Sequence, residues 1–152
     1  MGIRQYQAAG GVVIQQGILP DLDPATPYLL LLDRPDRGEV RLPKGHIDPG
    51  ENVEDTALRE TEEEAGFADL AVLADLGSNR VEFDYKENHY IRDEHYFLIA
   101  LRSPRQSQRP ANDAQQFRPL WVELDEAVNG LSFTAEQQVV QKAVEAYRAL
   151  MG

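Results

Sequence analysis

The chain has 152 residues, no cysteine and a formal net charge of −11 at pH 7. This length suffices for one domain with a substantial core, so we expect residues 1–152 to form a single domain. The absence of cysteine excludes disulfides and thiolate metal sites and is compatible with a reducing cytoplasm, where we expect the protein to act. The charge argues against binding to extended nucleic acid, and no apolar run approaches the ~20 residues of a membrane span. The sequence does not indicate an oligomeric state.

The first third of the chain predicts two buried strands joined by a loop. Residues 8–15 end in a β-branched run, and residues 28–32 are continuously apolar, as is typical of buried strands. Between them, residues 18–27 contain three prolines and two aspartates and are expected to form a loop. Residues 41–43 predict a short strand, which leads into a stretch interrupted by several prolines and glycines.

A helix is predicted at residues 53–65, which contain neither glycine nor proline, and Gly66 is expected to end it. Glu60, Glu63 and Glu64 are spaced i, i+3 and i+4, so they lie within an arc of about 100° on one side of this helix. Like charges so arranged repel unless a cation lies between them, and a hard divalent cation such as Mg²⁺ prefers oxygen ligands. The alternative is a solvated acidic face without a ligand.

The second half of the chain predicts four more strands and two helical segments. A polar, proline-containing loop is expected at residues 103–113, and a turn at residues 86–88. The last helix is expected to begin near Thr134, which stands three residues before Gln137 in a capping-box pattern, and to carry a one-sided apolar stripe. We therefore predict an α/β fold in which a mixed sheet is covered on both faces by amphipathic helices. The expected strands are residues 70–76, 80–85, 94–101 and 120–123, and a short helical turn is expected at residues 124–128.

The helix and the loop before it contain one continuous motif. Gly45 is followed after five residues by Glu51, and after seven more by the run from Arg59 to Phe67, Arg-Glu-Thr-Glu-Glu-Glu-Ala-Gly-Phe. This pattern resembles the Nudix box of the Nudix hydrolase family, although the family usually has an aliphatic residue where Thr61 stands. The resemblance implies the Nudix α/β/α sandwich, with a mixed β-sheet between helices, and a pyrophosphohydrolase enzyme.

Nudix hydrolases cleave a nucleoside diphosphate linked to another group and use Mg²⁺ or Mn²⁺. Bridging metal ions make the approach of a polyphosphate to a carboxylate-lined site favourable and activate the attacking water. The resemblance implies metal ligands from the three glutamates and from one backbone carbonyl. These residues are Gly45, through its carbonyl, Glu60, Glu63 and Glu64.

The same resemblance assigns supporting roles within the box. Arg59 is implied to orient the catalytic glutamates through charge-assisted hydrogen bonds, with Glu51 as one partner. Gly66 is implied to be structural. The general base varies within the family, so the sequence does not show which glutamate accepts the proton. A further acidic ligand from a later segment is also common in the family, and Glu82, Asp113 or neither could supply it here.

The substrate is indicated by a looser resemblance around the box. The run Pro-Lys-Gly-His at residues 43–46 is similar to the diadenosine polyphosphate hydrolase branch of the family, which cleaves asymmetrically. It implies a small nucleotide substrate, with diadenosine tetraphosphate cleaved to ATP and AMP. By position, Lys44 and His46 would contact phosphates and Tyr85 would stack on adenine. A structural hydrogen bond for His46 and core packing for Tyr85 remain open.

Two other functions remain open. The first keeps the pyrophosphohydrolase activity but acts on damaged nucleoside triphosphates, nucleoside diphosphate sugars or the 5′ end of RNA. Arg102, Arg105 and Arg109 could contact such an RNA end, and a solvated loop is the alternative for them. The second is a non-catalytic nucleotide-binding sensor, although sensors usually have degraded boxes and this box retains its acidic residues.

Overall fold

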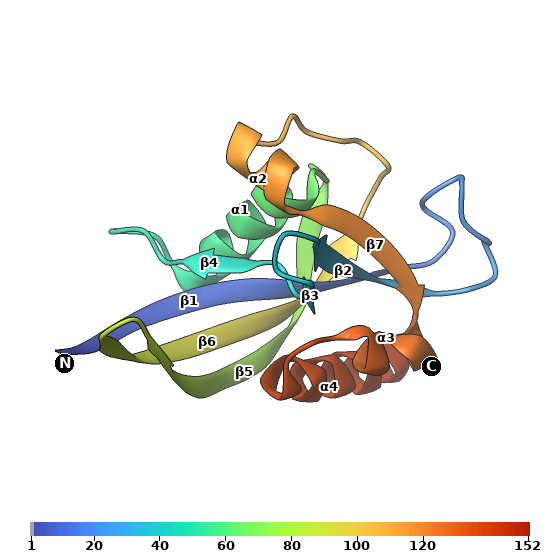
Figure 1. The fold of residues 1–152 in the computed structure, drawn as a ribbon. Coiled ribbons are helices and arrows are strands. Elements are labelled where there is room, and N and C mark those ends of the chain that lie inside the picture. The colour runs from blue at the N-terminus through green and yellow to red at the C-terminus, as the bar shows by residue number, and fades with distance from the viewer. Residues whose placement is uncertain (1) are drawn as a thin grey trace.

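A mixed sheet forms the centre of the computed structural model, which describes residues 2–152 (Figure 1). The strand order is β3-β2-β1-β6-β5, with β4 paired to β1 and β7 paired to β2. The pairing of β1 with β6 is parallel, and the other pairs are antiparallel. The strands are β1 (Gly2–Gln15), β2 (Tyr28–Arg34), β3 (Glu39–Arg41), β4 (Lys44–His46), β5 (Leu70–Tyr85), β6 (Asn88–Leu101) and β7 (Arg118–Glu123).

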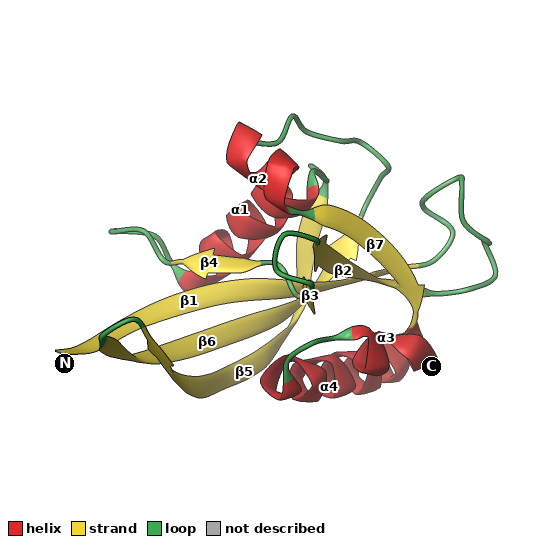
Figure 2. Ribbon diagram, viewed as in Figure 1, coloured by secondary structure: helices red, strands yellow, loops and turns green. Residues whose placement is uncertain are grey.

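Helices cover both faces of this sheet, as Figure 2 shows. One core cluster lies between the sheet and helices α3 and α4, and the other lies beneath α1. In β6, Tyr96 and Leu98 face the first cluster, whereas Phe97 and Ile99 face the second. This strand is buried on both faces, which explains its continuous apolar run, and the predicted α/β architecture is confirmed. The helices are α1 (Val53–Ala65), α2 (Ala111–Gln116), α3 (Leu124–Gly130) and α4 (Thr134–Met151).

The helix that carries the motif has the predicted ends. Asn52 caps its N-terminus, because the side chain accepts a hydrogen bond from the backbone N–H of Asp55 at 2.8 Å. Gly66 ends it in the left-handed conformation, at φ 83°, and donates to the carbonyl of Glu62 at 2.8 Å. Thr61, the departure from the aliphatic pattern, is fully buried against the sheet.

Several predicted boundaries were wrong. The strands expected at 70–76 and 80–85 form one strand, β5, which continues through a register irregularity at Gly77, whose φ is +84°. The short strand expected at 41–43 is instead two strands separated by Pro43, which has no N–H to donate to a ladder. Residues 111–113, the last part of the predicted polar loop 103–113, belong instead to helix α2.

The capping box predicted at the last helix was also wrong. Thr134 is the first residue of α4 and makes no capping hydrogen bond, and the preceding Phe133 takes the cap position. The Gln137 side chain donates instead to the carbonyl of Leu131 at 3.1 Å. Within residues 2–152, no helix is both long and apolar enough to cross a bilayer.

Candidate active site

Helix α1 presents Glu60, Glu63 and Glu64 beside strand β4, which contains Lys44 and Gly45. Glu64 is buried, with 6% of its surface exposed, while the Glu63 side chain is 36% exposed. Burial raises the pKa of Glu64 to about 8 and also raises the pKa of Glu60, and neighbouring carboxylates add to both increases. This side of the helix therefore concentrates acidic groups in a poorly solvated place, which disfavours their ionised forms unless a cation is bound.

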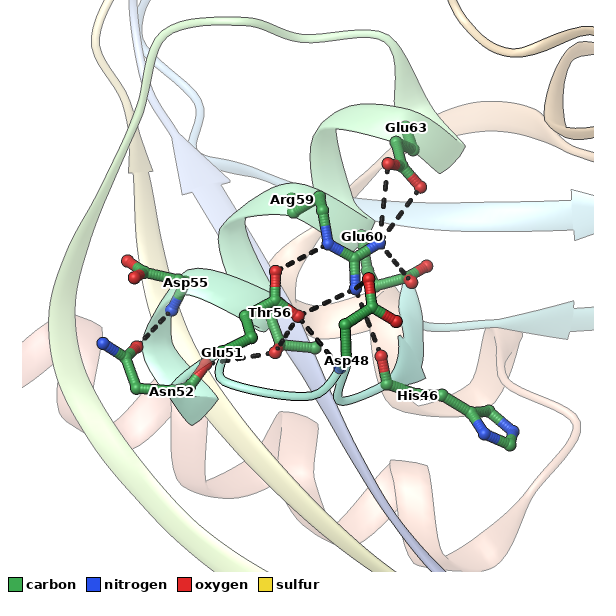
Figure 3. Close-up of polar contacts among 9 residues, drawn as sticks. All are labelled: His46, Asp48, Glu51, Asn52, Asp55, Thr56, Arg59, Glu60 and Glu63. Carbon is green, nitrogen blue, oxygen red and sulfur yellow. Dashed lines mark hydrogen bonds and ion pairs between the residues drawn. The ribbon is translucent and has the colours of Figure 1, made fainter.

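Arg59 lies at the centre of a hydrogen-bond network on this side (Figure 3). Its Nε and Nη2 donate to the two oxygens of Glu51, at 2.8 and 3.0 Å, in a bidentate pair. Its Nη1 donates to Glu60 at 2.8 Å and to Glu63 at 3.3 Å, and its Nη2 also donates to the carbonyl of His46 at 3.2 Å. Arg59 thus contacts Glu51 as expected, and its role in orienting the glutamates stays a prediction.

Glu51 holds this network from the loop side. Its carboxylate accepts hydrogen bonds from Arg59 and from the Thr56 hydroxyl, at 2.6 Å in the second case. The Arg59 bond and then the Thr56 bond lower the pKa of Glu51 to about 2, so this carboxylate stays ionised. The same pair raises the pKa of Arg59. The two residues therefore form a permanent ion pair next to the acidic side of α1.

Lys44 and Gly45, in strand β4, contact two of the glutamates directly. The backbone N–H of Lys44 donates to Glu64 at 2.9 Å. A Cβ placed on Gly45 would lie only 2.1 Å from Cδ of Glu60, so the Glu60 carboxylate occupies the space that any other residue would fill. Gly45 pairs with Ala9 in the sheet, which fixes its backbone in position. Only glycine therefore fits at position 45 while the Glu60 carboxylate lies this close to the Gly45 backbone.

The donor set suits a hard divalent cation. Glu60 and Glu63 share the Arg59 guanidinium, Glu64 accepts a hydrogen bond from the Lys44 N–H, and Mg²⁺ and Mn²⁺ prefer carboxylate oxygen ligands of this kind. In the conformation described for residues 2–152, no three histidine, cysteine or acidic side chains converge closely enough to hold a metal ion. Glu60 and Glu63 are directed toward Arg59 and Glu64 toward the Lys44 N–H, so metal binding requires these side chains to turn toward one another.

Of the two candidates for an additional acidic ligand, only Asp113 lies beside the glutamates. Burial raises the pKa of Asp113, and the charge of Glu63 raises it further. Asp113 in turn contributes to the raised pKa values of Glu60 and Glu64. Glu82 instead bonds His89 at 3.0 Å in the β5–β6 hairpin. The position of Asp113 supports it over Glu82, although ligation itself stays a prediction.

The side chain of Lys44 is directed into the protein, away from α1. Its ammonium donates to Glu136 at 2.5 Å and lies 3.9 Å from Glu94. The other oxygen of Glu136 accepts from the backbone N–H of Leu42 at 3.0 Å. Glu136 therefore links helix α4 to the loop that contacts the glutamates. Sequence reasoning missed this link, although a charged residue on the apolar stripe of α4 was a usable signal.

His46 and Tyr85 differ in their surroundings. The His46 ring is exposed and stacks on Tyr6, with centroids 4.3 Å apart, and its backbone carbonyl accepts from Arg59. Tyr85 is 46% exposed, so the alternative of core packing is wrong for this residue. The structure thus leaves both rings accessible, and their contacts with substrate stay predictions.

A cavity of about 360 Å³ lies between the β5–β6 hairpin, strand β3 and the start of α4. Phe83, Tyr85 and Phe133 contribute apolar surface to its wall. The charged lining residues are of both signs: the cations Arg37, Arg41, Lys44 and Arg92, and the acids Glu39, Asp84, Glu94 and Glu136. Since the backbone of Lys44 also contacts Glu64, the cavity adjoins the acidic side of α1. A planar group and an anionic chain can therefore occupy adjacent positions beside the glutamates.

Comparison with known proteins places this chain in a family. The family model of the NUDIX domain matches residues 13–145. The chain is 32% identical over 137 residues to the asymmetrical bis(5′-nucleosyl)-tetraphosphatase of Rattus norvegicus, and the match covers 90% of this chain and 91% of that protein. The corresponding protein of Mus musculus is 31% identical over the same coverage.

A solved structure supports the fold. The crystal structure of a binary complex of the C. elegans Ap4A hydrolase matches with a TM-score of 0.69 at 24% sequence identity, covering 95% of this chain and 98% of that one. At this identity the likeness shows the fold alone. Hydrolases of this family generally use divalent metal ions and act on small nucleotides. The chain therefore belongs to the Nudix family and is a pyrophosphohydrolase of nucleoside polyphosphates.

Proposed function

We propose that this protein is a Mg²⁺- or Mn²⁺-dependent hydrolase that converts diadenosine tetraphosphate and one water molecule to ATP and AMP. The observation that carries the proposal is the cavity beside the α1 glutamates, whose wall combines exposed Tyr85 with cationic side chains. The similarity to asymmetrical bis(5′-nucleosyl)-tetraphosphatases along 90% of the chain supports this substrate. An adenine needs a flat apolar surface and the phosphate chain needs positive charge, and both are present.

The metal ion would be held by Glu60, Glu63, Glu64 and the carbonyl of Gly45. When bound, it neutralises phosphate charge and activates water for in-line attack on phosphorus. Arg59, itself fixed by the bidentate pair with Glu51, keeps Glu60 and Glu63 on one side of α1, from which both would turn toward a bound ion. A glutamate of this group that is free of the metal can accept the proton of the attacking water, and which one does so is left open.

The substrate would lie across the cavity. Tyr85 offers its ring to one adenine, and His46 lies on the loop next to the glutamates. Lys44 contributes positive charge from the wall of the cavity, although its ammonium is already paired with Glu136. We therefore assign Lys44 a supporting electrostatic role toward the phosphate chain, together with the backbone N–H that holds Glu64.

Product analysis in heavy-oxygen water tests the substrate and the point of attack together. With diadenosine tetraphosphate and Mg²⁺ or Mn²⁺, we expect ATP and AMP in equal amounts, with the label in only one of them. Damaged nucleoside triphosphates, nucleoside diphosphate sugars and triphosphate-ended RNA form the comparison panel. Faster turnover of any of these than of diadenosine tetraphosphate contradicts the proposed substrate.

Glutamate variants test the site. Glu63→Gln and Glu64→Gln are each expected to lower kcat by orders of magnitude and to leave the circular dichroism spectrum intact. Glu62→Gln is the matched control, because Glu62 lies on another side of the same helix. If both site variants keep wild-type activity, the assignment of the site is wrong. Tight nucleotide binding without hydrolysis by the wild-type protein, with either metal, would establish a sensor instead.

A further inference from the structure

Arg41, in strand β3, has an unusual environment for an arginine. Its guanidinium lies 5.6 Å from the centre of the Phe117 ring, and Phe117 is buried. Arg34 lies 5.5 Å from the same ring. Packing on an aromatic ring fixes the direction of a guanidinium but uses none of its N–H donors. The Arg41 guanidinium is therefore held in position while its N–H donors stay available for a hydrogen-bond acceptor.

The Arg41 guanidinium has no acceptor in the part of the chain that the structure describes, residues 2–152. Its Nε is buried without a hydrogen-bond partner, and none of the ion pairs includes it. Arg34, by contrast, bonds Asp36 at 3.3 Å. A buried donor without an acceptor is unfavourable, and more so when it is charged. An anionic ligand would remove this cost.

The position of Arg41 shows where such a ligand would lie. Arg41 lines the cavity beside Lys44, and its positive charge acts on the Glu64 carboxylate. The positive charge of Lys44 is offset by Glu136, and Arg37, which also lines the cavity, is exposed at its edge. Among residues 2–152, Arg41 is thus a cavity-lining cation without a direct ion-pair partner, placed between the cavity and the acidic side of α1 so that its charge reaches Glu64.

We propose that Arg41 binds a phosphate of the substrate and thereby helps to select substrates with long phosphate chains. The guanidinium presents paired N–H donors that match two oxygens of one phosphate. This inference rests on the proposed function only in requiring a polyphosphate substrate. Because the reacting diphosphate lies at the glutamates, Arg41 contacts a phosphate beyond it. Its contribution is accordingly larger for diadenosine tetraphosphate than for ADP-ribose, which has two phosphates.

The kinetic test compares Arg41→Gln, Arg41→Lys and the matched control Arg34→Gln, which removes a guanidinium from the same ring. For diadenosine tetraphosphate at saturating Mg²⁺, we expect Arg41→Gln to raise KM by about tenfold to a hundredfold with a smaller change in kcat. Arg41→Lys should give an intermediate value, because lysine keeps the charge without the paired donors. The KM for ADP-ribose should rise less, and Arg34→Gln should change neither KM.

A binding measurement separates this inference from the proposed function. Calorimetric titration with inorganic tripolyphosphate at saturating Mg²⁺ needs no turnover, and we expect Arg41→Gln to weaken binding by at least about tenfold. Equal tripolyphosphate affinity in Arg41→Gln and wild type, or equal loss in Arg34→Gln, overturns the role of Arg41. Failure of the wild-type protein to cleave diadenosine tetraphosphate contradicts the proposed substrate alone, and tripolyphosphate binding still tests Arg41.

Discussion

Replacing Gly45 by alanine should separate activity from stability. The new Cβ would lie 2.1 Å from Cδ of Glu60 and 2.3 and 2.4 Å from its two oxygens, closer than the 3.0 Å that real Cβ contacts respect. The backbone of Gly45 is held in the sheet opposite Ala9, so the carboxylate has to move. A retreat of about 1 Å takes Glu60 out of its hydrogen bond with Arg59, and a misplacement of this size costs about a hundredfold in rate.

Stability should change little in the same variant. The group displaced is the free end of a flexible side chain, and alanine is less costly than glycine in a strand, so we expect a change in unfolding free energy below about 1 kcal/mol. Initial rates at saturating Mg²⁺ and urea unfolding curves measure the two effects. Gly130→Ala is the control, because its Cβ would meet only a terminal methyl of Leu31, at 3.3 Å.

A double variant tests the route of the effect. If Gly45→Ala acts by moving Glu60, it should add little to the loss already caused by Glu60→Gln, since the two changes remove one interaction. Losses that multiply fully in the double variant would refute the reasoning. So would a Gly45→Ala enzyme that retains the wild-type kcat.

Two further predictions concern the Lys44–Glu136 ion pair and a histidine of the β5–β6 hairpin. Glu136→Ala leaves the buried ammonium of Lys44 with only Glu94, at 3.9 Å, so urea unfolding should show a loss of about 3–5 kcal/mol; a loss below about 1 kcal/mol contradicts the buried pair. The ring of His89 donates hydrogen bonds to the carboxylates of Glu82 and Asp84, and these bonds raise the pKa of His89 above its usual 6.5. The folded hairpin is therefore stabilised fully below pH 6.5, and this contribution is lost as the pH rises through the folded pKa. NMR titration should show a His89 midpoint above 6.5 that falls in Glu82→Gln, and a midpoint at or below 6.5 would exclude the two bonds.

The sequence predicts correctly those helices and strands whose ends are set by residues close together in the chain. Helix α1 was predicted with its ends because uninterrupted helix-forming residues and Gly66 act within a few residues of one another. Two strands are predicted where the structure has the single strand β5, because a glycine in a strand pattern, here Gly77, is typical of a bulge and of an interruption alike. The capping box predicted for α4 was wrong because Thr134 is the first residue of the helix and Gln137 donates its side-chain hydrogen bond to the carbonyl of Leu131.

The parts of the site that were missed depend on contacts between distant segments. Glu136 and Lys44 are 92 residues apart, and no local pattern pairs them. The free guanidinium of Arg41 is recognisable only once Phe117 and the cavity are placed around it. The residues of the box were accessible because a fixed spacing on one helix encodes their geometry directly.

The link from α4 to the loop has a consequence for biosynthesis. During synthesis, the segment with Lys44 and the glutamates leaves the ribosome well before Glu136, which fixes Leu42 and Lys44. A nascent chain that lacks α4 has a loop without its anchor and an unneutralised lysine in an unfinished core. The bonds from Leu42 and Lys44 to Glu136 can therefore form only after α4 has been synthesised, so the segment that contacts the glutamates reaches its final packing late.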